Sequence, residues 1–184
     1  MLLVSLMFSL SLFAQSHLEF RGVPINGHID NFVAKMKTLG YVVEDRDSDG
    51  ATMTGKFTNR PVTLYVFCSP KSKTVYSVAL SFQKQSSWTS LKSRYLEYKE
   101  LYTSKYGVPQ NEMGKFTSPY YEGDGYEIQA LKLGKCKYAS LFEKSNGSIM
   151  ITLSDDSCLL LYYYDKTNDA LNEKESKSSA LDDI

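Results

Sequence analysis

The sequence is poor in the side chains on which most hydrolytic and metal-dependent enzymes rely. Its 184 residues include two histidines, His17 and His28, and three cysteines. A serine or cysteine nucleophile usually needs a histidine base, and a structural zinc site needs four suitable ligands. No His-Glu-x-x-His, Cys-x-x-Cys, Gly-x-Ser-x-Gly or phosphate-loop motif is present. The sequence therefore predicts no catalytic residue, no cofactor and no metal ligand.

Neither sign of charge is in excess. The chain has 21 basic and 21 acidic residues, and its lysines and arginines form no block. A nucleic-acid surface needs a clustered basic patch, so binding to DNA or RNA is not expected. The apolar run at residues 2–13 is shorter than the roughly 20 residues that span a bilayer.

Residues 1–16 have the features of a signal peptide. An uncharged apolar core, Leu2–Phe13, is followed by the small residues Ala14 and Ser16. We therefore expect a periplasmic or secreted protein whose mature domain begins near His17 and has no stable membrane span. No lysine or arginine precedes the core, which leaves open a start upstream of Met1. A buried first strand is the alternative interpretation.

The cysteines, Cys68, Cys136 and Cys158, allow at most one disulfide between them. In a meander one strand would separate Cys136 from Cys158, which places them about 9.6 Å apart, beyond ordinary disulfide reach. A bulge could bring this pair together. Three small buried apolar residues are the alternative.

The segment Ser86–Pro109 predicts a long amphipathic helix. Ser86 or Ser87 can cap its first turn, and Gly107 followed by Pro109 ends it. The opposite face, which includes Lys92, is expected to be in water. The predicted buried stripe follows steps of three and four: Trp88, Leu91, Tyr95, Tyr98, Leu101, Tyr102 and Tyr106.

Alternating segments on both sides of this helix predict two antiparallel meanders. A first helix over residues 29–39 precedes strands at 41–44, 51–57, 62–68 and 75–82; strands at 113–116, 126–133, 136–143, 149–153 and 158–164 follow the central helix. Within 75–82, Tyr76 and Val78 are expected to point inward. The order predicts an α+β domain, 17–165, of two tandem helix-plus-antiparallel-meander repeats, 18–83 and 86–165. These would form a shared or paired sheet packed against the helices. Residues 166–184 are polar and predict a mobile tail.

One acidic segment, Asp45-Arg46-Asp47-Ser48-Asp49-Gly50, matches the opening of a calcium loop. The complete loop needs a bidentate glutamate at its twelfth position, which is Lys56 here, and Arg46 is a competing cation. An acidic hairpin turn explains the same residues. The sequence leaves open whether Asp45, Asp47 and Asp49 bind calcium.

Several motifs are spread over the whole chain: Phe13-Ala14-Gln15, Phe20-Arg21-Gly22-Val23-Pro24-Ile25-Asn26-Gly27, Trp88, Lys105-Tyr106-Gly107-Val108-Pro109, Cys136-Lys137-Tyr138 and Ala180-Leu181-Asp182-Asp183-Ile184. Together they resemble a group of uncharacterised small exported proteins of Gram-negative gut bacteria. The group implies no catalytic residues. The helix-plus-four-strand order is also similar to the tandem repeats of beta-lactamase inhibitor protein, a likeness of architecture only.

Aromatic side chains are the residues in excess, with 14 tyrosines and 13% aromatic residues overall. They favour a strand-rich fold, and an aromatic binding surface is the alternative. The candidate partner-binding residues are Tyr120, Tyr121 and Tyr126, which lie in a glycine-containing segment that could also be a plain loop. The same segment holds Glu122, Asp124 and Glu127, which could act as paired carboxylates in a glycosidase.

These observations favour an exported, non-enzymatic binding protein with a protein or glycan partner. The alternatives are an exported hydrolase that uses paired carboxylates and a proteinaceous inhibitor of a secreted enzyme.

Overall fold

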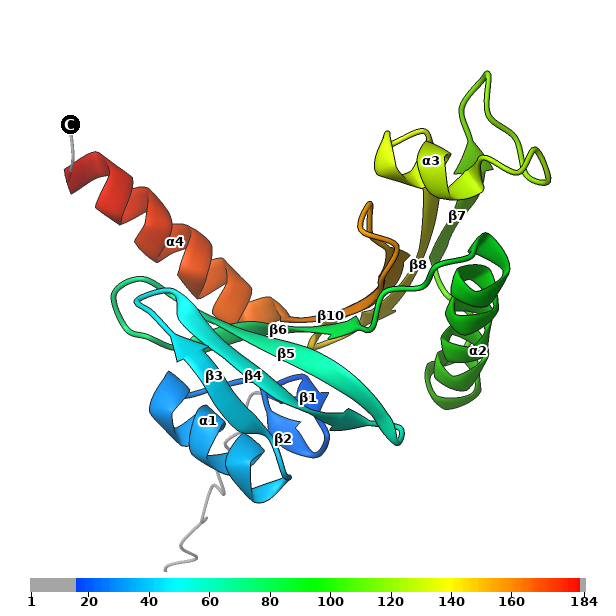
Figure 1. Ribbon diagram of the computed structural model, residues 1–184. Coiled ribbons are helices and arrows are strands. Elements are labelled where there is room, and N and C mark those ends of the chain that lie inside the picture. The colour runs from blue at the N-terminus through cyan, green and yellow to red at the C-terminus, as the bar shows by residue number, and fades with distance from the viewer. Residues whose placement is uncertain (1–15, 183–184) are drawn as a thin grey trace, which may run out of the picture.

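The central element of the computed structural model, which describes residues 16–182, is an eight-stranded antiparallel sheet (Figure 1). Four consecutive strands from each half of the sequence form a meander, and the two meanders meet where β6 pairs with β10. The predicted α+β class and antiparallel sheet are therefore confirmed. In order across the sheet the strands are β3 (Val42–Arg46), β4 (Gly50–Phe57), β5 (Arg60–Cys68), β6 (Val75–Phe82), β10 (Leu159–Asp165), β9 (Gly147–Leu153), β8 (Cys136–Lys144) and β7 (Asn111–Phe116).

One face of this sheet is covered and forms the core. Alternate residues of the central strands, such as Leu64, Val78 and Leu161, are fully buried against the covering elements. These elements are α1 (Ile29–Thr38), α2 (Trp88–Tyr106) and a short hairpin of β1 (Glu19–Phe20) and β2 (Val23–Pro24), all on one side of the sheet (Figure 1). Each fully buried aliphatic side chain contributes roughly 1.5–3 kcal/mol to folding.

The central helix α2 forms where its spacing predicts it. The Ser87 hydroxyl accepts a hydrogen bond from the Ser90 N–H at 3.2 Å, and Gly107 ends the helix with a φ of 86°. Leu91, Tyr95, Tyr98 and Tyr102 are buried, while Trp88 and Tyr106 are half-buried. One member of the predicted stripe was wrong: the side chain of Leu101 is 49% exposed.

A predicted strand at residues 126–133 is wrong, because this segment forms α3 (Glu127–Lys132). Its buried residues, Glu127, Ala130 and Leu131, have the spacing of a helix face. Gly134, with a φ of 66°, follows the end of this six-residue helix and stops it after fewer than two turns. The apolar residues of this segment fit a short strand as well as a short helix, and only the burial pattern in the structure distinguishes these two possibilities.

The predicted mobile tail is also wrong for residues 166–182, which form α4 (Lys166–Asp182). The Asp165 carboxylate accepts a hydrogen bond from the Asn168 N–H at 3.0 Å and so satisfies a free donor of the first turn. Alanine, leucine, glutamate and lysine, which favour helix, then continue it. The composition is polar because only Asn168 of this helix is buried.

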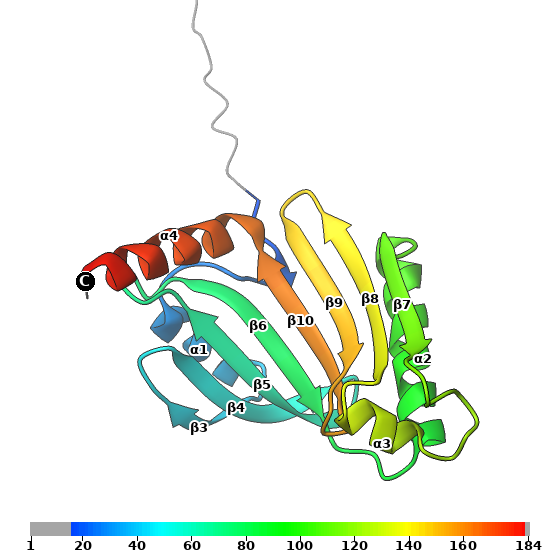
Figure 2. The same ribbon diagram turned by 90° about the horizontal axis from the view of Figure 1, so that it is seen from above.

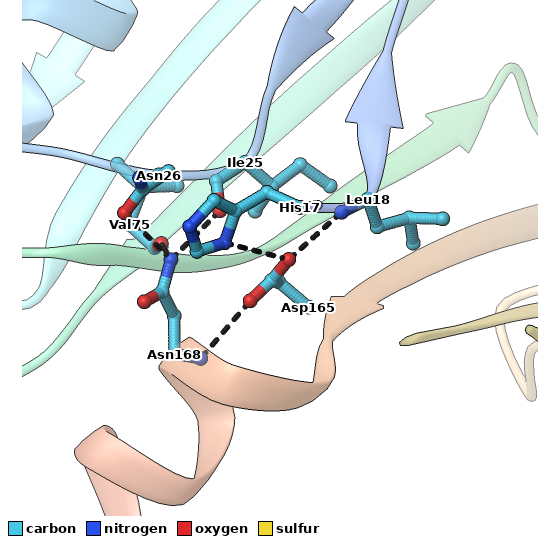
Figure 3. A network of polar contacts seen from close by, with 7 residues as sticks. All are labelled: His17, Leu18, Ile25, Asn26, Val75, Asp165 and Asn168. Atoms are coloured by element: carbon cyan, nitrogen blue, oxygen red, sulfur yellow. Dashed lines mark hydrogen bonds and ion pairs between the residues drawn. The ribbon is translucent and has the colours of Figure 1, made fainter. Parts of the chain in front are cut away.

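Asn168 and Asp165 join α4 to the N-terminal segment and to β6 (Figure 3). The Asn168 amide donates to the carbonyls of Ile25 and Val75 at 2.9 and 3.1 Å. The second Asp165 oxygen accepts from the Leu18 N–H at 2.8 Å and from His17 at 3.1 Å. His17 is therefore held in a structural contact. The predicted signal peptide, residues 1–16, lies outside the described residues except for Ser16.

Candidate binding surface

The face of the sheet opposite α1 and α2 carries no helix across its central strands (Figure 2). Helix α4 crosses only one end of these strands, while α3 and the segment that joins it to β7 stand at the other end (Figures 1 and 2). We call this surface the open face. Its residues on the central strands are Thr63, Tyr65 and Phe67 of β5, Tyr76, Ser77, Ala79 and Ser81 of β6, Leu160, Tyr162 and Tyr164 of β10, and Ser148, Met150 and Thr152 of β9.

Strand register aligns apolar side chains directly across the open face. Tyr162 of β10 lies opposite Met150 of β9 and Ala79 of β6. The row continues on the outer side of each partner, to Leu141 of β8 and Tyr65 of β5. Tyr65 is 38% exposed, whereas Ala79, between Tyr65 and Tyr162 in this row, is 3% exposed. The result is a band of apolar surface five strands wide.

Further rings lie beside this row, close to α4. The rings of Tyr162 and Tyr164 stack with centroids 5.9 Å apart, and those of Phe67 and Tyr76 lie 6.4 Å apart. Burial raises the pKa of the Tyr162 and Tyr164 hydroxyls, so both stay neutral hydrogen-bond donors at ordinary pH.

The inward direction predicted for Tyr76 is wrong. The register between β5 and β6 shifts at Phe67 and Cys68, so that Tyr76 is the extra residue of a bulge. Val75 enters the core instead, and the Tyr76 ring contacts Phe67 on the open face. A one-residue insertion of this kind exchanges the two faces of a strand, which an alternating pattern cannot reveal.

Charged side chains occupy only the margins of the open face. On the four central strands, β5, β6, β9 and β10, its described residues are aromatic, aliphatic, serine or threonine. Lys137 and Glu143 follow on β8, and Glu44 and Asp45 lie on β3, where Glu44 accepts a hydrogen bond from Thr54 at 2.6 Å. An uncharged, aromatic centre surrounded by charged residues is the composition typical of protein interfaces.

The predicted partner-binding tyrosines lie together at one edge of this surface. Tyr120, Tyr121 and Tyr126 line a hollow of about 400 Å³ with Asp124 and Gln129. Tyr121 and Tyr126 are 65% and 61% exposed, whereas Tyr120 packs on the core and accepts a hydrogen bond from Gln129 at 3.2 Å. The structure therefore makes two of the three accessible to a partner. The segment stands at the end of β7 and β8, beside α3 (Figure 1).

The three carboxylates of this segment hold the loop in place. Glu122 accepts hydrogen bonds from the Trp88 indole at 3.4 Å and the Tyr138 hydroxyl at 3.2 Å, and it pairs with Lys92. The hydrogen bond from Lys92 lowers the pKa of Glu122, whereas a general acid needs a raised one.

The other two carboxylates bind backbone N–H groups. Asp124 accepts from Tyr121 and Tyr126 at 3.0 and 2.7 Å, and Glu127 accepts from Gly123 at 2.8 Å. All three side chains therefore have partners within their own loop, on α2 or on β8, which favours a structural role over the hydrolase alternative.

The acidic segment forms the predicted hairpin turn between β3 and β4. The Asp47 carboxylate accepts from the N–H groups of Asp49 and Gly50 at 2.8 and 2.9 Å, and Arg46 pairs with Asp30 of α1. Within residues 16–182, no three acidic, cysteine or histidine side chains converge as a metal site would require. Helix α1 begins after His28, whose ring accepts a hydrogen bond from the Asp30 N–H at 3.3 Å.

The cysteines form no disulfide: Cys68 and Cys136 are buried, and Cys158 is half-buried. Cys136 opens β8 and Cys158 precedes β10, with β9 between these strands, as expected. Burial raises the pKa of the Cys136 thiol to about 12, so it behaves as a small apolar residue of the core.

The sequence predicted most strands of the open face and offered an aromatic binding surface as an alternative, but it did not locate that surface on these strands. The only signal was the tyrosine excess together with the alternation in β5 and β10.

Among the described helices, none is both long and apolar enough to cross a membrane. Comparisons with protein-family models, curated proteins and solved structures find no match to this chain, so the two resemblances drawn from the sequence stay predictions.

Proposed function

We propose that this chain is a non-enzymatic binding protein that docks a folded protein partner on its open face. The observation that carries the proposal is the absence of charge from the described residues of that face on four adjacent central strands, with rings in their place. Aromatic residues are enriched and charged residues depleted at the centres of protein interfaces. Strands held in a sheet also present these rings with little conformational entropy to lose.

The size of the open face favours a protein over a short glycan. Eight strands with seven spacings of about 4.8 Å give a width of roughly 34 Å, and three outward positions per strand give a length of roughly 20 Å. The product, roughly 680 Å², is close to the roughly 800 Å² that each partner contributes to a standard interface. The exposed Tyr121 and Tyr126 would extend this contact at the rim.

Position-specific photocrosslinking tests the proposal. A benzoylphenylalanine residue replaces Tyr65 on the open face, Tyr121 on the rim, or Leu96 on α2. Leu96 is the matched control because it is 46% exposed on the opposite side. Each variant is irradiated in an envelope extract, with unlabelled protein added in excess as a competitor.

The proposal predicts one adduct of defined mass from positions 65 and 121, none from 96, and loss of the adduct with the competitor. A competitor carrying Tyr65→Ser should displace it at least tenfold less well. Equal adducts from all three positions would contradict the proposal. An adduct of twice the chain mass would assign the face to a second copy, and binding to an oligosaccharide array alone would assign it to a glycan.

The predicted leader supports export to the periplasm or beyond, which we include in the proposal; cell fractionation with an antibody to the chain tests it.

We also propose that residues 18–83 and 86–165 are tandem repeats. The supporting observation is the order of elements: a helix and then four antiparallel strands occur twice, and the last strands, β6 and β10, pair at the centre. Helix α3 is an insertion between β7 and β8 of the second unit.

A further inference from the structure

A cavity of about 690 Å³ lies on the covered side of the sheet, away from the open face. The C-terminal half of α2 forms one wall, and the β1–β2 hairpin and the β8–β9 turn form others. Cavities of this size hold small organic ligands, and few of them occur in one protein. The cavity also explains why Leu101 is exposed on an otherwise buried stripe: its side chain lines this space.

The floor of the cavity consists of aromatic rings whose polar atoms are already paired. The hydroxyls of Tyr102 and Tyr163 hydrogen-bond to each other, and that of Tyr98 hydrogen-bonds to Thr58. Tyr102 and Tyr163 are buried residues, and burial raises the pKa of both, so they remain neutral. An apolar ligand could therefore cover these rings without leaving a hydroxyl unsatisfied.

The mouth of the cavity is positively charged. The ammonium groups of Lys105 and Lys144 lie 5.1 and 5.2 Å from the centroid of the Tyr106 ring, so both cations flank one side chain. Within residues 16–182, neither lysine forms an ion pair with a carboxylate. Arg21 adds a third cation, and Glu19 is the one acidic side chain in the described lining.

We propose that this cavity binds an amphipathic organic anion. The apolar part of the ligand would lie against the exposed Leu101 and above the buried rings of Tyr98 and Tyr102, and its carboxylate or sulfonate would lie at the mouth beside Lys105 and Lys144. The charge at the mouth selects an anion, and the paired hydroxyls of the floor select an apolar body. The proposal is independent of partner binding on the open face, because the two sites lie on opposite sides of the sheet.

Titration with 1-anilinonaphthalene-8-sulfonate, a fluorescent aromatic anion, tests the cavity. We expect saturable binding of one molecule per chain. The double variant Lys105→Gln, Lys144→Gln should bind the dye about tenfold more weakly. Its control is Lys35→Gln, Lys37→Gln, which removes two exposed lysines from α1 and should leave the affinity unchanged.

A second pair of variants tests the apolar part. Leu101→Trp places a larger side chain in the cavity and should abolish binding, whereas Leu96→Trp, at a similarly exposed position of the same helix, should not. The neutral analogue N-phenyl-1-naphthylamine should bind wild-type protein more weakly than the dye and should be insensitive to the lysine variants. Circular dichroism confirms that each variant is folded.

The inference is overturned if both lysine variants bind alike, or if Leu96→Trp and Leu101→Trp weaken binding equally. Should Leu101→Trp fail to fold, the lysine variants decide the question alone. Dye binding that is lost in Tyr65→Ser but kept in the cavity variants would assign the dye to the open face, and would also contradict the inference.

Discussion

At the scale of single residues, one buried amide holds together segments that are distant in the sequence. Asn168 is 4% exposed, and its side chain donates to Ile25 and Asn26 near the N-terminus and to Val75 at the start of β6. Its own N–H donates to Asp165 at the end of β10. Because the carbonyls of Ile25 and Val75 lie in buried contacts, they depend on this side chain for these hydrogen bonds.

Replacement of Asn168 by alanine should lower the free energy of unfolding by about 1–3 kcal/mol, because buried carbonyls lose their donor. Urea denaturation followed by circular dichroism measures the change. Asn172→Ala, one turn later on α4, is the control and should stay within about 0.5 kcal/mol of wild type. An equal loss of unfolding free energy at the two positions would show that the hydrogen bonds of Asn168 do not stabilise the fold more than an ordinary residue of α4 does.

The thiols should differ in reactivity. Burial raises the pKa of Cys136 to about 12, so it should not react with a disulfide reagent at pH 8 in the folded protein. The half-buried Cys158 should react first, and all three thiols should react after unfolding in urea. Rapid reaction of Cys136 in native protein, with Cys136→Ser as the blank, would mean that β8 opens locally.

At the scale of elements, the helices show what a local pattern can predict. Helix α2 was predictable because its capping serine, its stripe and its terminal glycine lie within one segment. Helix α3 could not be predicted, because the apolar residues of a six-residue segment fit a strand equally well. Helix α4 was missed because its docking depends on Asn168 and Glu175, which bind residues far away in the sequence. The bulge at Tyr76 has no sequence signature.

The buried stripe of α2 can be tested with two leucines of one helix. Leu91 is fully buried and Leu96 is 46% exposed. Leu91→Ala should therefore cost roughly 2–5 kcal/mol of unfolding free energy, and Leu96→Ala less than about 1 kcal/mol. Thermal denaturation of both variants measures the difference, and similar losses would mean that the helix is rotated about its axis. The predicted water-facing residue Lys92 is a poorer control, since it pairs with Glu122.

Docking of α4 should weaken in acid. Burial alone would raise the pKa of Glu175, but N–H groups of Ser72 and Lys71, at 2.9 and 2.8 Å, lower it from the ordinary 4.5 to about 2. A lowered pKa in the folded state means that this stabilisation is present above pH 4.5 and is lost as the pH falls towards 2. Amide hydrogen exchange in α4 should quicken over this range.

Glu175→Gln is the control for that measurement, because an amide oxygen can accept the same hydrogen bonds without titrating. In this variant, amide exchange in α4 should depend on pH only as exchange in an unfolded peptide does. A wild-type protein that matched the variant would indicate that another group controls the acid response.

At the scale of the whole molecule, the arrangement of the two meanders could be predicted only in part. Alternation and turn residues identify strands, but which strands pair across the sequence depends on contacts that no local pattern contains. The pairing of β6 with β10 brings Ala79 opposite Tyr162, and this register creates the central row of the open face. The tyrosine excess indicated an aromatic surface without locating it.

Because β6 and β10 join the two meanders through continuous pairing, the molecule should unfold in one step. Trp88, the single tryptophan, reports on the second half, whereas far-ultraviolet circular dichroism reports on all strands and helices. The two signals should give the same urea midpoint. A separate midpoint for tryptophan fluorescence would show that the halves are independent.

The positions of β3 and β7 determine how this sheet can meet another molecule. Both are terminal strands with an unpaired side, and such edges invite polymerisation by strand addition. Here β3 carries Glu44, Asp45 and Arg46 and a register shift that distorts its backbone, and β7 carries Glu112 and Lys115. Charge and distortion both discourage growth of a fibril from these edges. Another molecule should therefore contact this protein through the open face and should not add a strand to either edge of the sheet.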